Sequence, residues 1–117
     1  MTDSMTDCLF CAIAAGDMPA NIVSETDRVV VFHDVSPQAP VHVLAIPRKH
    51  FANVSDLAEQ DPALAAELLA SATKAARSLG LIDGYRVVFN TGEDGGQSVN
   101  HVHAHVLGKR QLTWPPG

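Results

Sequence analysis

The stretch HVHAHVL, residues 101–107, places three of the six histidines of the chain at alternate positions. Because successive side chains of a β-strand point to opposite faces, this pattern predicts a strand with His101, His103 and His105 on one face. Side chains on one face lie about 6–7 Å apart, so the row can line one small anionic ligand such as a phosphate. The alternative interpretation is the solvated polar face of an edge strand.

These closely spaced histidines restrict one another's charge. Like charges at this distance lower one another's pKa, so a state with all three imidazoles cationic is unfavourable. The pattern therefore favours one neutral imidazole as a nucleophile and a neighbour that supplies protons near neutral pH.

A glycine-rich loop, NTGEDGGQS at residues 90–98, leads directly into the histidine row. Adjacent Gly95 and Gly96 let the backbone approach a ligand and direct N–H groups toward it. Asn90, Gln97 and Ser98 add side-chain donors. Glycine-rich hairpin loops are common, but the position of this one before the histidines indicates a phosphate cradle.

The composition indicates a single compact domain. With 117 residues and 12.4 kDa, the chain has room for one domain, which we place at residues 8–117 after a frayed start at 1–7. A net charge of −5 argues against nucleic acids and anionic membranes as partners. No apolar run approaches the ~18 residues of a membrane span. The acidic, polar start and the small number of cysteines favour a reducing, cytoplasmic setting.

The remaining periodicities predict an α+β fold. A long helix is expected at residues 62–79, with Asp61 as its N-cap, Pro62 at its first position and Gly80 as its stop. A short apolar segment at residues 8–15 predicts a small N-terminal helix. Several β-rich segments predict an antiparallel five-stranded meander with the long helix packed across it. The expected strands are residues 22–25, 28–33, 41–46, 85–90 and 101–107.

The chain resembles the histidine-triad (HIT) family. The run HVHAHVL matches the triad signature, in which histidines alternate with apolar residues. FHDVSPQAPVH at residues 32–42, DGGQS at 94–98 and WPPG at 114–117 are similar to the Hint branch of nucleoside phosphoramidases, and the likeness covers nearly the whole chain. This resemblance implies a homodimer that joins two five-stranded sheets, with the long helices at the interface.

The resemblance also implies a reaction. Members of this branch cleave a purine nucleoside phosphoramidate, or a related nucleoside monophosphate derivative, at its α-phosphorus through a covalent nucleotidyl-histidine. His103 corresponds to the nucleophile, His105 to a donor toward a non-bridging phosphate oxygen, and His42 to a member of the same imidazole cluster. The other implied phosphate contacts are Asn90, Ser98 and the backbone of Gly96 and Gln97.

The nucleoside and the leaving group have implied contacts of their own. Asp34 matches the carboxylate that binds the ribose hydroxyls, and Trp114 matches a residue that reaches the site of the partner subunit. Asn100 departs from the family pattern, because close relatives carry an aromatic residue there, and this change can alter what the leaving-group side accepts. The residues implied to form the apolar purine slot are Leu9, Phe10, Ile13, Phe32, Val35 and Leu44.

Cys8 and Cys11 have the two-residue gap of a zinc knuckle. Tetrahedral zinc needs two further ligands, and since the chain holds no other cysteine these must be histidines. The resemblance maps them to His50 and His101, as in some bacterial triad proteins. Such a closed site is structural, and His101 is then a metal ligand instead of a catalytic acid or base. The alternative is a pair of small buried thiols; no motif demands a redox cofactor or magnesium.

Other functions stay open at this point. A dinucleoside polyphosphate hydrolase represents another triad branch, although the WPPG tail and the GGQS loop favour the phosphoramidase. A nucleotide-binding regulatory module with vestigial activity is the alternative from a different class, and the presence of every expected catalytic position counts against it. A purely structural zinc protein leaves Asp34 and the glycine-rich loop unexplained.

Overall fold

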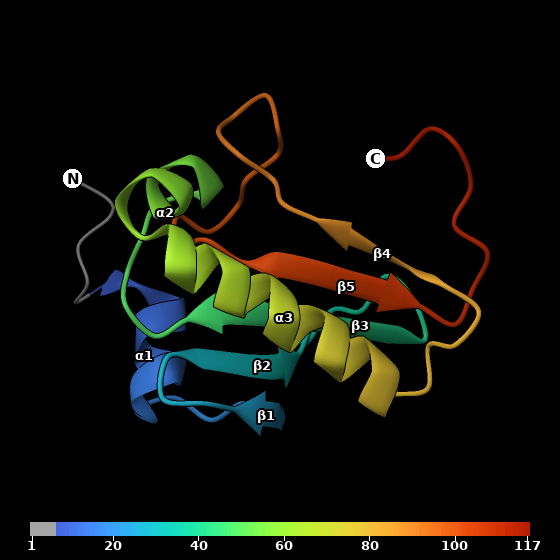
Figure 1. The fold of residues 1–117 in the computed structure, drawn as a ribbon, viewed down its shortest axis with the longest axis horizontal. Helices are drawn as coiled ribbons and strands as arrows, with labels where there is room; N and C mark the ends of the chain where they lie inside the picture. The colour runs from blue at the N-terminus through green and yellow to red at the C-terminus, as the bar shows by residue number, and fades with distance from the viewer. Residues whose placement is uncertain (1–6) are drawn as a thin grey trace.

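The computed structural model describes residues 7–117 and confirms the α+β class (Figure 1). The frayed start expected at residues 1–7 therefore falls, for residues 1–6, outside the described part of the chain. Along the described chain, a short helix is followed by three strands, then by two helices and finally by two strands. In chain order they are α1 (Leu9–Ala15), β1 (Ile22–Glu25), β2 (Val29–His33), β3 (Val41–Pro47), α2 (Val54–Gln60), α3 (Pro62–Ser78), β4 (Tyr85–Val88) and β5 (Ala104–Gly108).

The five strands form one antiparallel sheet in the order β1-β2-β3-β5-β4. The first three strands form the expected meander, but β5 lies between β3 and β4. Because α2 and α3 cross the sheet between β3 and β4, β4 returns parallel to β3 and one strand away, and β5 fills the gap (Figure 1). The histidine strand is thus an interior strand, and its interpretation as an edge strand is wrong.

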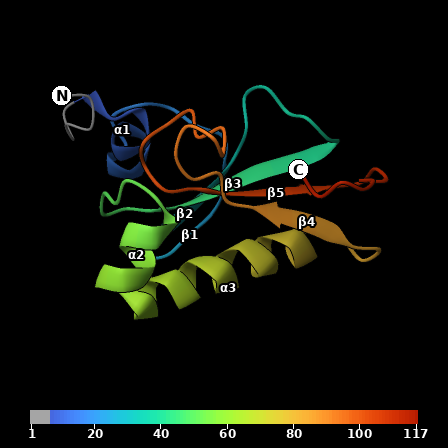
Figure 2. The same ribbon diagram turned by 90° about the horizontal axis from the view of Figure 1, so that it is seen from above.

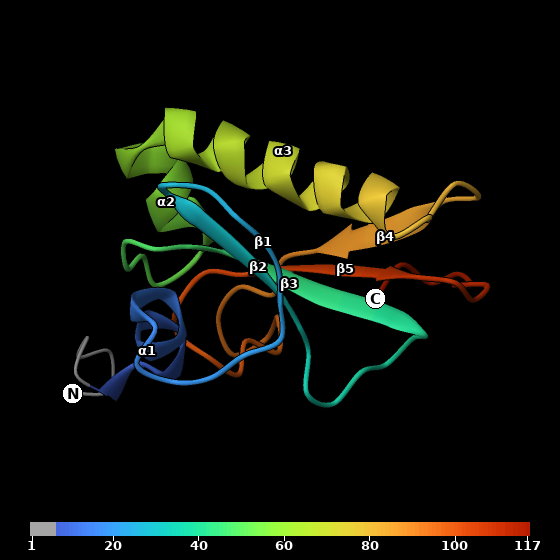
Figure 3. The ribbon, with the colours of Figure 1, turned by 90° about the horizontal axis from the view of Figure 1, so that it is seen from below.

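The long helix α3 begins where the sequence places its cap. Asp61 accepts a hydrogen bond from the backbone N–H of Leu64 at 3.0 Å, and Pro62 occupies the first turn. The helix ends at Ser78, one residue before the expected position. Its apolar stripe packs on one face of the sheet, and α1 lies on the opposite face (Figures 2 and 3). The buried residues of the stripe are Leu64, Leu68, Ala72, Ala75 and Ala76.

Helix α2 was not expected from the sequence. Asn53 caps it by accepting a hydrogen bond from the backbone N–H of Asp56 at 2.9 Å. The helix is only 7 residues long and buries Leu57 alone, so it carries too little apolar periodicity to be recognised. No helix among residues 7–117 is long and apolar enough to cross a membrane.

The alternation along the strands separates two cores. One core lies under α3 and includes Val102, Ala104 and Val106, the apolar residues between the histidines. The other lies under α1 and includes Phe32 and Leu44. The ladder of β5 begins at Ala104, three residues later than expected, but the alternation already holds at Val102, whose N–H donates to the carbonyl of Phe51 at 2.8 Å. The three histidines therefore point to the α1 side.

Candidate active site and metal centre

His103 lies almost fully buried beside α1, with 5% of its surface exposed. Its Nδ1 lies 2.8 Å from the backbone carbonyl oxygen of His101. A carbonyl only accepts, so Nδ1 carries the proton and Nε2 keeps its lone pair. Burial lowers the pKa of His103, against opposing effects of the His101 carbonyl and of Asp34. At neutral pH the ring is therefore an uncharged base with a free Nε2.

A chain of hydrogen bonds fixes the opposite tautomer in His105. The backbone N–H of Gln38 donates to His42 Nδ1 at 3.0 Å, so the proton of neutral His42 sits on Nε2. That nitrogen lies 2.9 Å from His105 Nδ1 and 3.5 Å from a carboxylate oxygen of Asp34. His105 Nδ1 thus accepts, and its Nε2 carries a proton.

Both rings of this chain are uncharged near pH 7. Burial, followed by the neighbouring His103 and His42, lowers the pKa of His105 to about 4, although Asp34 opposes this shift. Burial also lowers the pKa of His42, although Asp34 opposes that shift. The ring centroids of His103 and His105 lie 4.9 Å apart. A nitrogen lone pair and an imidazole N–H thus stand side by side, as the division of roles predicted from the sequence requires.

These two rings help to line an apolar cavity of about 410 Å³. Met18, Pro19 and Ala20, which the sequence did not single out, join its wall because Gly16, at φ 82°, ends α1 and turns the chain back. Val35 stands at its rim, 99% exposed. The predicted residues that line the cavity are Leu9, Phe10, Ile13, Phe32, Asp34, Val35, Leu44, Ser98, His103 and His105; His33 and Val99 complete it.

A larger hollow of about 500 Å³ lies between residues 83–86 and 109–112. No histidine or cysteine of the described chain lines it. The chemistry-bearing side chains gather instead at the cavity under α1, which we take as the candidate active site.

The glycine-rich loop uses two of its predicted donors to hold itself. Asn90 Nδ2 donates to the carbonyl of Gly95 at 2.8 Å. Gln97 Nε2 donates to the carbonyl of Ala52 at 2.6 Å, and Gln97 Oε1 accepts from the N–H of Gly92 at 3.0 Å. A Cβ at Gly95 would clash with the backbone carbonyl of Thr91, so this close turn requires glycine. Of the polar side chains expected from this loop, Ser98 lines the cavity.

Asp34 and Trp114 lie in very different surroundings. One carboxylate oxygen of Asp34 accepts from the backbone N–H of Ser36 at 2.8 Å, and the side chain stands at the cavity beside His42. Trp114 is 85% exposed in the C-terminal tail and does not line the cavity of its own chain.

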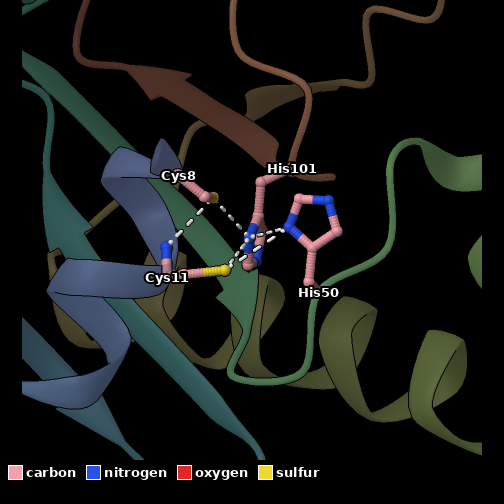
Figure 4. A group of neighbouring side chains, drawn as sticks. All are labelled: Cys8, Cys11, His50 and His101. Carbon is pink, nitrogen blue, oxygen red and sulfur yellow. Dashed lines mark hydrogen bonds between the residues drawn. The ribbon is translucent and has the colours of Figure 1, made fainter. Parts of the chain in front are cut away.

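Cys8, Cys11, His50 and His101 form a second cluster, which we call the cysteine–histidine cluster (Figure 4). Their ligand atoms all lie within 4.8 Å of one another. His101 is 0% exposed, and its Nε2 donates to the carbonyl oxygen of Pro47 at 2.8 Å. Its Nδ1 lone pair therefore faces the two sulfurs, at 3.3 Å from Cys8 and 3.4 Å from Cys11. The structure thus brings together all four residues that the sequence and the resemblance predicted.

The distances in this cluster fit tetrahedral zinc. Zinc with nitrogen ligands at about 2.0–2.1 Å and sulfur ligands at about 2.3 Å separates two nitrogens by about 3.3 Å, and nitrogen from sulfur by about 3.6 Å. The His50 and His101 Nδ1 atoms lie 3.2 Å apart, and Cys11 Sγ lies 3.4 Å from His50 Nδ1. Burial, followed by Cys8, raises the pKa of Cys11 to about 12, so a bound cation must displace the thiol proton. Two thiols and two imidazoles are a donor set that zinc prefers.

Asp34, His42 and His105 also bring three ligand atoms within 4.8 Å. The protonated Nε2 of His42 points toward the other two residues as a donor, however, instead of offering a lone pair. This group therefore fits a hydrogen-bond chain better than a metal site.

Comparisons with known proteins agree with this geometry. The chain matches the HIT domain family over residues 15–112. It belongs to the HIT domain family. An uncharacterised HIT-like protein of Synechococcus elongatus is 47% identical to this HIT protein over 111 residues, 95% of this chain and 97% of the relative.

Solved structures share the fold over most of the chain. The crystal structure of a HIT family hydrolase from Legionella pneumophila is 50% identical, with a TM-score of 0.90 over 94% of this chain and 99% of that chain. A Zn-bound histidine triad family protein from Mycobacterium smegmatis is 32% identical, with a TM-score of 0.79 over 92% of this chain and 78% of that chain.

Proposed function

We propose that this HIT protein hydrolyses purine nucleoside phosphoramidates through a covalent nucleotidyl-His103. The observation that carries the proposal is the pair of opposite tautomers in the lining of the apolar cavity: His103 offers a lone pair, and His105 offers an N–H. The Legionella relative, which is described as a HIT family hydrolase, has the same fold at 50% identity and so supports hydrolysis as the class of reaction.

In the first step, the lone pair of His103 Nε2 forms a bond to the α-phosphorus while the phosphorus–nitrogen bond breaks. The leaving nitrogen takes up one proton from the solvent and departs as an amine. In the second step, water attacks the phosphorus and releases one proton to the solvent, the bond to His103 breaks, and Nε2 recovers its lone pair. The net reaction adds one water across the phosphorus–nitrogen bond.

The surroundings of His103 stabilise this intermediate. When Nε2 bonds to phosphorus the ring becomes cationic, and the His101 carbonyl, already 2.8 Å from Nδ1, accepts a stronger hydrogen bond. His105 donates its Nε2–H to a non-bridging oxygen, where negative charge develops. Ser98, which lines the cavity, adds a further donor to the phosphate. The backbone N–H groups of Gly96 and Gln97, which the resemblance also implied as phosphate contacts, donate instead to the carbonyls of Glu93 at 3.0 Å and Gly92 at 3.1 Å.

The rest of the cavity binds the nucleoside. Its wall of Phe10, Ile13, Phe32 and Leu44 matches the flat apolar faces of a purine ring. Asp34 is the carboxylate at the cavity, and we assign it to the ribose hydroxyls because two adjacent hydroxyls suit one bidentate acceptor.

We also propose a homodimer built along β4. This edge strand exposes Tyr85, and its Arg86 donates to the carbonyl of Thr113 at 2.7 Å, which holds the exposed Trp114 beside the edge. In a dimer joined at this edge, Trp114 reaches the leaving-group side of the partner site. Light scattering at micromolar concentration tests this assembly: a monomeric mass contradicts it.

The cysteine–histidine cluster holds zinc in this proposal. Cys8, Cys11, His50 and His101 supply a closed set of four ligands, which leaves no open position for chemistry. The Mycobacterium relative, described as Zn-bound, supports the assignment. Zinc there ties α1 to the loop after β3 and to the start of the histidine row.

The proposal is tested by comparing kcat/KM for an adenosine phosphoramidate with that for a diadenosine polyphosphate. We expect the phosphoramidate to be the better substrate by about tenfold or more, since the WPPG tail and the GGQS loop favour the phosphoramidase branch. A preference for the diadenosine polyphosphate moves the protein to the dinucleoside polyphosphate branch. Binding of AMP with no turnover of either substrate indicates a regulatory nucleotide-binding module.

A further inference from the structure

We infer that the cysteine–histidine cluster positions the nucleophile, so that ligation of the cluster sets the orientation of His103 and the shape of the cavity. The inference rests on the proposed role of His103. It goes beyond a metal site that only stabilises the fold, because it makes the four ligands positioning residues for the reaction.

The first connection runs through the backbone of His101. The side chain of this residue is held in the cluster through Nδ1 and at the Pro47 carbonyl through Nε2. Its backbone carbonyl is the group that accepts the Nδ1–H of His103 at 2.8 Å. The peptide group that carries this carbonyl is also held by the Val102 N–H, which donates to the Phe51 carbonyl at 2.8 Å. The position of the carbonyl is therefore set jointly by this hydrogen bond and by the side chain of His101 in the cluster.

The second connection runs through α1. Cys11 belongs to the cluster, and the preceding residue, Phe10, packs edge-on against His103 with ring centroids 5.1 Å apart and an interplanar angle of 86°. Phe10 also packs against Phe32 of the cavity wall at 5.6 Å. A shift of Cys11 therefore moves the side chain that confines the His103 ring and shapes the cavity.

The two ends of α1 are held in different ways. Near its C-terminal end, Arg48 donates to the carbonyl of Ala14 at 2.7 Å. At its start, Cys8 and Cys11 are the residues that connect the helix to His50 and His101. Release of the cluster leaves α1 held by this hydrogen bond at its C-terminal end, whereas its start is then held only by the packing of the buried Phe10.

His50 is the sharpest probe of this coupling. It follows β3, belongs neither to α1 nor to the histidine row, and does not line the candidate active site. Its Nδ1 joins the cluster, while its Nε2 is buried without a hydrogen-bond partner among residues 7–117. An effect of His50→Ala on His103 that removal of zinc from the wild type reproduces therefore passes through the cluster.

The experiment compares wild type, His50→Ala and Ala15→Ser, each loaded with zinc and after removal of zinc by a chelator. Ala15→Ser places a hydroxyl on the exposed end of α1, outside the cluster, and serves as the matched control. Three properties are measured: the Nδ1–H signal of His103 in imidazole-detected NMR, the Kd for AMP, and kcat with an adenosine phosphoramidate. The first two need no turnover, so they report on the coupling even if the proposed reaction is absent.

Zinc-loaded wild type and Ala15→Ser should share a sharp His103 Nδ1–H signal. Zinc-free wild type and His50→Ala should lose or broaden that signal, bind AMP at least tenfold more weakly, and lower kcat by about 10²-fold, since displacement of a reacting group by about 1 Å costs that much. Returning zinc to the wild type should restore all three properties.

An unchanged His103 signal and AMP affinity in folded, zinc-free protein would overturn the inference. So would complete unfolding of both His50→Ala and zinc-free wild type, seen by circular dichroism, because the cluster then only holds the fold together. Loss of the His103 signal without zinc, in a protein that turns over no phosphoramidate in any form, would refute the proposed reaction and leave the coupling standing.

Discussion

His101 and His103 are two residues apart on one extended segment, point to the same side of the sheet, and are both nearly inaccessible to water. Their rings nevertheless carry the proton on different nitrogens. His101 donates from Nε2 to the Pro47 carbonyl and presents Nδ1 to two sulfurs. His103 donates from Nδ1 to the His101 carbonyl and leaves Nε2 free beside the apolar cavity.

This contrast shows that a backbone carbonyl can decide the role of a histidine. Burial lowers the pKa of both rings, in His101 to about 4, so neither is cationic at neutral pH. Because both rings are uncharged, His101 and His103 differ in the direction in which the nitrogen lone pair points. In His101 it points at the sulfurs of Cys8 and Cys11, and in His103 at the place proposed for phosphorus. His105, whose Nδ1 accepts from His42, completes the comparison as the donor.

The largest expected effect comes from removing the free Nε2. His103→Ala should lower kcat by about 10⁴-fold or more, because the nucleophile is lost, while the Kd for AMP changes less than about tenfold, or ~1.4 kcal/mol. Single-turnover kinetics and calorimetry with AMP measure the two quantities. Hydrolysis by this variant at the wild-type rate would contradict the assigned nucleophile.

The donor should matter less than the nucleophile. His105→Ala should lower kcat by about 10²–10³-fold, as removal of one preorganised donor to a developing oxyanion does. His105→Gln keeps an N–H group and should retain more activity than the alanine variant. Equal losses in the two variants would show that His105 does not act as a donor.

Removal of zinc from the cysteine–histidine cluster, which contains His101, should lower the thermal stability of the protein. Chelation should lower the Tm of wild type by about 10 °C or more, because a ligand held only by the folded state adds to its stability. Cys8→Ser provides the control, since a chelator should then have little further effect on the Tm. A wild-type Tm that does not respond to chelation would mean that the cluster holds no metal.

A smaller effect is expected from pH. The pKa of His105 is lowered from 6.5 to about 4 in the folded protein. As pH falls from about 6.5 to about 4, the unfolded chain therefore takes up a proton that the folded chain does not, and the free energy of unfolding decreases; above pH 6.5 this contribution is constant. The Tm of wild type and His105→Gln, followed across this range, should show a shallower pH dependence in the variant. Parallel curves would contradict the lowered pKa.

The sequence predicted the layers of the fold because local signals were strong. The cap at Asp61 and the alternation at residues 101–107 each depend on neighbours in the chain. The insertion of β5 between β3 and β4 could not be predicted in this way, because it depends on how α2 and α3 return the chain across the sheet. The short helix α2 buries too little to leave a period in the sequence.

The candidate site shows the same difference between features that local sequence signals predict and features that depend on the folded chain. Residue types and family likeness pointed to the cavity wall, the histidines and the cysteine–histidine cluster, which the structure brings together. The tautomers of the histidines could not be predicted from the sequence, because they depend on the backbone carbonyls of Pro47 and His101 and on the backbone N–H of Gln38. The sequence also could not predict that Asn90 and Gln97 bind backbone carbonyls and so hold the glycine-rich loop in place. An amide side chain looks the same in a sequence whether it binds a ligand or the backbone.

The most direct test of the account is to trap the proposed intermediate. Wild-type protein is mixed with an adenosine phosphoramidate, quenched within one turnover under conditions that preserve phosphorus–nitrogen bonds, and mapped by peptide mass spectrometry. The account predicts one adenylyl group, attached to His103 and absent from His103→Ala. Rapid turnover with no labelled protein, or a label on His101 or His105 instead, would contradict it.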